Sequence, residues 1–96
     1  MEKIKSMLEN PTVSIIDVRN TWEYQMECIK GSINIPLGEL INRIEEIKKL
    51  PQPIVIHCLS GGRSAEAVSI LTQLGIEEVY NGGGLDTMKN MMYAKV

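Results

Sequence analysis

Apolar residues recur along the chain in two patterns that predict different elements. Runs rich in Ile and Val predict buried strands over residues 13–18 and 54–58, with shorter strands at 32–36 and 78–80. Spacings of three and four residues predict helices near residues 2–9, 20–29, 37–47, 65–74 and 88–92. Strands alternating with helices over so short a length indicate an α/β fold with a small parallel sheet flanked by helices.

Three of these elements carry more detailed expectations. Asn20 is placed as a helix N-cap with Glu23 as its capping-box partner, and Trp22, Met26 and Ile29 are expected to form a buried stripe. The helix over 37–47 is expected to be continuous and amphipathic, with a stripe of Leu37, Leu40, Ile41, Ile44 and Ile47. The helix over 65–74 is expected to bury Ala65, Val68, Leu71 and Leu74, while 81–84 is predicted to be a loop and the methionines after it a core-packing helix.

Composition narrows the class of protein. A chain of 96 residues with 44% hydrophobic residues predicts a single domain over 1–96, whose core must be mostly Ile, Leu, Val and Met because there is no Phe. The net charge of -2 and the scattered lysines argue against nucleic-acid binding. No signal-peptide core and no run of roughly 18 apolar residues is present, so we expect a cytoplasmic protein that does not bind a membrane. With two cysteines and one histidine, neither a disulfide framework nor a metal site is expected.

Candidate chemistry concentrates at the end of the second long strand. Cys58 follows that strand directly, and a loop with Gly61 and Gly62 leads through Arg63 and Ser64 into a helix. A strand-to-helix turn aims backbone N–H groups at one point, and the helix N-terminus adds partial positive charge there. A thiol at this point should ionise more readily than free cysteine, so we expect Cys58 to be a nucleophile in an anion cradle.

Four segments in order resemble the signatures of a single-domain rhodanese, and they cover nearly the whole chain. They are Ile16-Asp17-Val18-Arg19, the stretch from Ile29 to Leu37, the stretch from Cys58 to Ser64, and Val79-Tyr80-Asn81-Gly82-Gly83. The resemblance implies a rhodanese-like three-layer α/β/α fold and a thiosulfate sulfurtransferase. In such an enzyme Cys58 takes a sulfane sulfur from a donor such as thiosulfate, carries it as a persulfide, and passes it to a thiol or cyanide.

On this interpretation the substrate-binding cradle is formed by Leu59, Ser60, Gly61, Gly62, Arg63 and Ser64. No metal or other cofactor is expected, and the partners are a small-molecule donor and acceptor or a sulfur-relay protein. Three hypotheses remain open: a thiosulfate sulfurtransferase, a persulfide carrier that receives sulfur from a protein, and a cysteine-based phosphatase or arsenate reductase. The phosphatase loop of similar fold is one residue longer between Cys and Arg, which counts against that third reading.

Neighbouring residues are given structural roles. Arg63 either adds a guanidinium to the rim of the cradle or braces the loop through a carboxylate. Asp17 and Arg19 are expected to organise loops through an ion pair, with Glu23 as a further partner. His57 should point away from Cys58 because strand side chains alternate, so we expect a satisfied structural histidine. Cys28 is expected to be a small apolar filler, with a resolving thiol as the minority hypothesis.

Overall fold

The computed structural model describes residues 2–93, and a parallel four-stranded sheet lies at its centre. Its order is β2-β1-β3-β4, and its strands are β1 (Ser14–Asp17), β2 (Ile33–Asn34), β3 (Ile54–His57) and β4 (Val79–Gly83). The helical segments are α1 (Glu2–Leu8), α2 (Thr21–Met26), the 3₁₀ turn η1 (Leu37–Glu39), α3 (Ile44–Lys48), α4 (Gly62–Gln73) and α5 (Leu85–Tyr93). The predicted α/β class with a small parallel sheet is confirmed.

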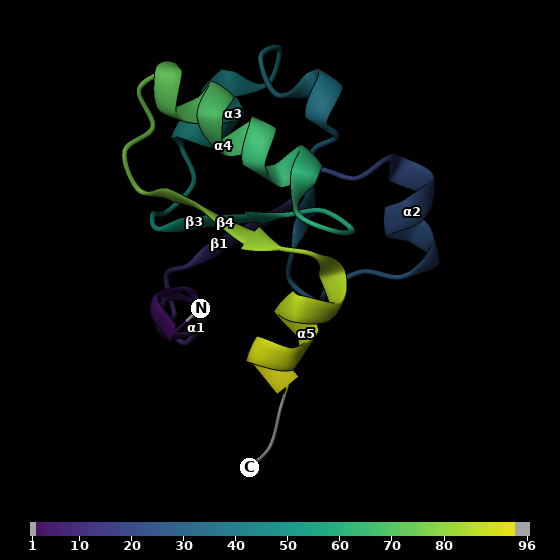
Figure 1. Cartoon of the computed structure of the whole chain (residues 1–96). Coiled ribbons are helices and arrows are strands. Elements are labelled where there is room, and N and C mark those ends of the chain that lie inside the picture. Colours follow the sequence, from purple (N-terminus) through teal and green to yellow (C-terminus); the bar gives the residue numbers. More distant parts are fainter. Residues whose placement is uncertain (1, 94–96) are drawn as a thin grey trace.

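Helices cover both faces of the sheet and make a three-layer arrangement (Figure 1). On one face α3 and α4 bury a core that includes Ile16, Ile56 and Leu71. On the other face α1 and α5 pack on a smaller core that includes Val55 and Met88. Successive residues of β3 therefore contribute to opposite cores, as the alternation of strand side chains requires.

The helix predicted over 37–47 is wrong in its continuity. The chain forms η1, then turns, and only then forms α3. The N–H groups of Leu40 and Ile44 bond three residues back, to the carbonyls of Leu37 and Ile41, instead of four. Leu40 and Ile47 are fully buried, but Ile41 is 63% exposed. An apolar spacing of three is met equally well by a 3₁₀ turn, so the pattern did not distinguish the two.

The two predicted buried stripes are confirmed only in part: Ile29 and Leu71 are fully buried and Val68 packs against the core, but the other members are exposed. Trp22 and Met26 are 65% and 80% exposed, because α2 lies beside the sheet and is held to it mainly by polar contacts. On α4 the buried positions are Ser64, Ala67 and Leu71, whereas Ala65 and Leu74 are exposed. The buried face of α4 therefore includes Ser64, whose hydroxyl donates a hydrogen bond to Asn81 on β4.

The segment predicted as loop 81–84 is strand as far as Gly83. Ile56 pairs with Asn81 and His57 pairs with Gly83, so one extra residue of β4 is accommodated as a bulge. The final helix is confirmed as α5, with Met88 fully buried. This bulge places the side chain of Asn81 beside the loop that follows β3.

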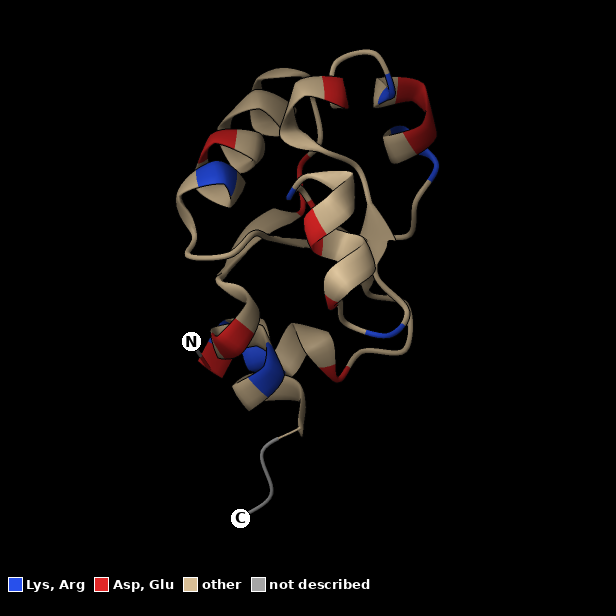
Figure 2. Ribbon diagram, turned by 90° about the vertical axis from the view of Figure 1, so that its right-hand side faces the viewer, with Lys and Arg blue, Asp and Glu red and all other residues tan. Residues whose placement is uncertain are grey.

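Charged residues of both signs are spread over several elements. In Figure 2 the Lys and Arg positions are interspersed with Asp and Glu on the side drawn. Within residues 2–93 no helix combines the length and apolar character needed to cross a membrane. The expectation that the chain does not bind nucleic acid stays a prediction.

Candidate active site

Cys58 lies at the carboxyl end of β3, where a sharp turn leads into α4. Gly61 adopts φ +103°, a left-handed conformation that residues with a Cβ rarely take. On the other side of the turn, the backbone of Gly84 lies so close that an added Cβ would sit 2.2 Å from the carbonyl oxygen of Leu59. These two glycines let the loop curl tightly against the end of β4.

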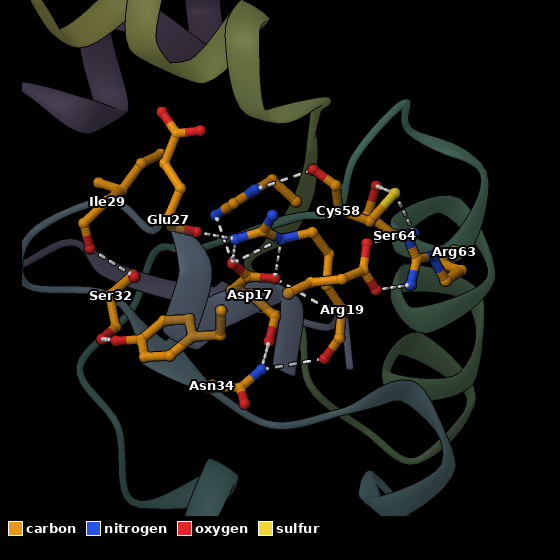
Figure 3. A network of polar contacts seen from close by, with 12 residues as sticks. Asp17, Arg19, Glu27, Ile29, Ser32, Asn34, Cys58, Arg63 and Ser64 are labelled. Carbon is orange, nitrogen blue, oxygen red and sulfur yellow. Dashed lines mark hydrogen bonds and ion pairs between the residues drawn. The ribbon is translucent and has the colours of Figure 1, made fainter. Parts of the chain in front are cut away.

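The sulfur of Cys58 is surrounded by hydrogen-bond donors. The Gly61 N–H donates to Sγ at 3.0 Å, the Ser64 N–H at 3.4 Å, and the Ser64 hydroxyl oxygen lies 3.5 Å away. Figure 3 shows the sulfur of Cys58 and the hydroxyl of Ser64 facing each other. Of the loop residues predicted to form the cradle, the backbones of Leu59, Gly62 and Arg63 make no hydrogen bond to this sulfur.

These donors change the acidity of the thiol. Cys58 is 1% exposed, and burial alone would raise its pKa. Hydrogen bonds from the Ser64 side chain and from the backbone of Ser64, Gly61 and Ser60 together outweigh burial, so the pKa of Cys58 lies below its ordinary value. Because the thiolate is the reactive form of cysteine, this environment favours a nucleophile.

Arg63 braces the loop from outside. Its guanidinium donates to both carboxylate oxygens of Glu23, at 2.7 and 3.1 Å. Glu23 also accepts from the Asn20 N–H at 3.0 Å, which confirms it as the capping partner of α2. The bidentate pair therefore joins the active loop to a helix that follows β1.

The Glu23–Arg63 pair predicts a stability that depends on pH. The hydrogen bond from Arg63 lowers the pKa of Glu23 from 4.5 to about 2. A carboxyl group with a depressed folded-state pKa adds stability above pH 4.5, and that contribution is lost as the pH falls toward about 2. Glu23→Gln should lower the free energy of unfolding at neutral pH and flatten its decline over this range, as measured by urea unfolding.

The matched control for this prediction is Glu66→Gln, which alters an exposed glutamate on α4. Its urea unfolding curve should follow that of the unaltered protein at each pH. If Glu23→Gln declines with acid as steeply as the unaltered protein, the pair with Arg63 contributes no pH-dependent stability.

A buried ion pair between Asp17 and Arg19 lies at the end of β1 and contacts the end of α2. Arg19 Nη2 lies 2.8 Å from Asp17 Oδ2, and Asp17 also accepts from the Arg19 backbone N–H. The same guanidinium donates to the Glu27 carbonyl at 2.6 Å, at the end of α2 (Figure 3). The predicted Asp17–Arg19 pair is confirmed, but Glu23 is the partner of Arg63 and makes no ion pair with Arg19.

Asn81 is a site residue that sequence reasoning missed. Its Oδ1 lies 2.7 Å from the Ser64 hydroxyl and accepts from the Gly83 N–H at 2.8 Å, while its Nδ2 donates to the Gly61 carbonyl at 3.2 Å. One amide thus links β4 to both ends of the cradle. Its place in the Val79–Gly83 signature was the available signal, but the assignment of that stretch to a loop hid it.

His57 and Cys28 differ from expectation in part. His57 is fully buried on the face opposite Cys58, as predicted, but only its Nδ1 has a hydrogen-bond partner and its Nε2 has none among residues 2–93. Cys28 is exposed, so its interpretation as an apolar filler is wrong. Within residues 2–93 no group of three or more His, Cys, Asp or Glu side chains is placed to hold a metal ion.

Comparisons with known proteins identify close similarities in sequence and fold. Residues 1–89 match the family model described as a Rhodanese-like domain. The thiosulfate sulfurtransferase PspE of Escherichia coli is 39% identical over 71 residues, which cover 73% of this chain and 68% of PspE. YrkF of Bacillus subtilis, a proposed sulfur carrier protein, is 34% identical over 84% of this chain and 44% of its own length. The structure of a rhodanese with anions from E. coli aligns at TM-score 0.71 and 37% identity, covering 78% of this chain and 89% of that one.

Proposed function

The chain belongs to the rhodanese-like family, and on this premise we propose that it transfers a sulfane sulfur from thiosulfate or a related donor to a thiol or cyanide through a persulfide on Cys58. The observation that carries the proposal is the set of donors around the sulfur, with Gly61 N–H at 3.0 Å and Ser64 N–H at 3.4 Å. Donors arranged in advance around one atom stabilise negative charge that develops there.

The proposed sulfur transfer consists of two successive displacements at sulfur. The Cys58 thiolate attacks the outer sulfur of thiosulfate, a new S–S bond forms, and the old one breaks as sulfite leaves with the electron pair. Cyanide then attacks the outer sulfur of the persulfide, thiocyanate leaves, and the thiolate is restored. A thiolate acceptor reacts in the same way and departs as a persulfide. Because the sulfur rests on the enzyme between the two steps, ping-pong kinetics are expected.

The cradle suits every anionic species in this cycle. The thiolate, the persulfide and the donor each bring negative charge to the N-terminus of α4, where partial positive charge and backbone N–H groups converge. The similar E. coli rhodanese is described as holding anions, which supports the same role here. Since Glu23 occupies the Arg63 guanidinium, we assign Arg63 to bracing the loop and anion binding to the backbone and Ser64.

Loop length favours sulfur over phosphate as the transferred group. Four residues, Leu59 to Gly62, separate Cys58 from Arg63, and this short loop curls around a single sulfur atom. A phosphatase or an arsenate reductase would need room for a tetrahedral oxyanion above the cysteine. The experiment described below distinguishes this phosphatase hypothesis from sulfur transfer.

Intact-mass analysis tests the proposal. After incubation with thiosulfate the protein should gain one sulfur atom, and added cyanide or a small thiol should remove it. The control is Cys28→Ser, which removes the exposed thiol and should gain and lose the sulfur as the unaltered protein does. Absence of the adduct together with turnover of an aryl phosphate would overturn the proposal in favour of a phosphatase.

A carrier would give a different result in the same experiment. The similarity to YrkF is the observation that favours this second candidate. A carrier would gain its sulfur from a persulfidated protein and not from free thiosulfate. Adding a persulfidated protein donor in a parallel incubation therefore separates the two candidates.

A further inference from the structure

A buried histidine contacts the backbone of the nucleophile, and the proposed chemistry does not use it. His57 is fully buried, and its Nδ1 lies 3.1 Å from the carbonyl oxygen of Cys58. Its Nε2 is buried without a hydrogen-bond partner among residues 2–93, 3.7 Å from Asp17 Oδ2. Both groups facing the ring are acceptors, and Asp17 is already held by Arg19.

The two distances assign the proton of the imidazole. Burial lowers the pKa of His57, so the ring is neutral near pH 7 and has one N–H group. Of the two acceptors, only the Cys58 carbonyl lies within hydrogen-bond distance. The proton therefore belongs on Nδ1, which donates to the Cys58 carbonyl.

This hydrogen bond orients the peptide that follows the nucleophile. The Cys58–Leu59 peptide is trans, so its carbonyl and its N–H point in opposite directions. The carbonyl faces His57, on the α5 side of the sheet, whereas the side chain of Cys58 packs on the α4 side. In a trans peptide the Leu59 N–H lies opposite this carbonyl, which turns it toward the side of the sulfur. None of residues 2–93 accepts a hydrogen bond from it.

We propose that His57 is a positioning residue that holds the Cys58–Leu59 peptide with its N–H aimed into the cradle, where it donates to the anion bound above Cys58. The role in sulfur transfer rests on the function proposed above, whereas the role in anion binding does not. The Leu59 N–H makes no contact with the sulfur of Cys58 itself, so the expected ligand is the outer sulfur or an oxyanion.

Two substitutions of nearly equal size test this inference. His57→Asn places an amide N–H at the position of Nδ1, whereas His57→Leu fills the same space with no donor. Both are made in the Cys28→Ser background, so that Cys58 is the one remaining thiol. The readout is the protection of Cys58 by sulfate against alkylation by iodoacetamide, which gives a sulfate dissociation constant without any sulfur transfer.

His57→Leu should raise the sulfate dissociation constant about tenfold, because one donor to the anion is lost. His57→Asn should keep that constant within about twofold of its parent. Thermal unfolding checks that both variants fold. A purely structural role predicts the opposite order, because leucine suits a buried site better than asparagine does.

The remaining outcomes are decisive. Equal sulfate protection in the two variants, or no sulfate protection in the parent, would overturn the inference. If the parent gains no sulfur from thiosulfate but the Leu and Asn variants still differ in sulfate protection, the proposed function fails and the role of His57 stands. If both hold, sulfur uptake from thiosulfate should fall in His57→Leu and be restored in His57→Asn.

Discussion

Cys58→Ser is expected to abolish the transfer of sulfur from thiosulfate to cyanide, with a loss on the order of 10³-fold or more. A serine hydroxyl is not ionised near neutral pH, so it cannot attack the outer sulfur of the donor. The N–H groups of Gly61 and Ser64 that donate to the sulfur can donate to a hydroxyl oxygen instead. We therefore expect the variant to fold, and steady-state thiocyanate formation measures the loss.

The second cysteine provides the comparison for this experiment. Cys28→Ser removes an exposed thiol on the segment after α2 and should leave the rate of thiocyanate formation unchanged. If Cys58→Ser retained sulfur transfer, or if Cys28→Ser lost it, the nucleophile would be Cys28 and not Cys58. The resolving-thiol hypothesis for Cys28 is tested separately by non-reducing mass analysis after oxidation, where an intramolecular disulfide is the required result.

Asp17→Ala should be among the most destabilising single substitutions in the chain. It would leave the guanidinium of Arg19, which is 3% exposed, without its counter-ion 2.8 Å away. Breaking a buried pair in this way costs roughly 3–5 kcal/mol, against a total stability of about 5–15 kcal/mol for a typical domain. Urea unfolding monitored by circular dichroism should show this loss directly.

Two further variants isolate the cause. Glu39→Ala removes an exposed carboxylate that pairs with Arg43 at 3.3 Å and should change the free energy of unfolding by less than about 1 kcal/mol. Adding Arg19→Ala to Asp17→Ala removes the unpaired charge, so the double variant should be no less stable than the single one. A double variant far less stable than Asp17→Ala would show that the packing of Arg19, and not its charge, is what matters.

Much of the fold could be predicted from short stretches of sequence. The runs that form β1 and β3 are rich in β-branched residues and are buried throughout, and the capping role of Glu23 depends on a residue three positions away. The loop after β3 is likewise local, since Cys58, Gly61 and Ser64 lie within seven positions and make the hydrogen bonds to the Cys58 sulfur among themselves. Interactions of this short range involve only residues that are close in the sequence, so a pattern within one stretch is sufficient to predict them.

The partners of that loop were decided by the tertiary structure. Arg63 meets Glu23 and Ser64 meets Asn81 because the order β2-β1-β3-β4 brings the ends of β1 and β4 to either side of β3. The same order leaves α2 beside the sheet, which exposes Trp22 although its spacing is typical of a buried stripe. The sequence by itself therefore determined the two central strands, β1 and β3, and the short loop that carries Cys58. Which carboxylate braces the loop and which amide links it to β4 depend on contacts between segments far apart in the sequence, and only the packing of the whole sheet brings these segments together.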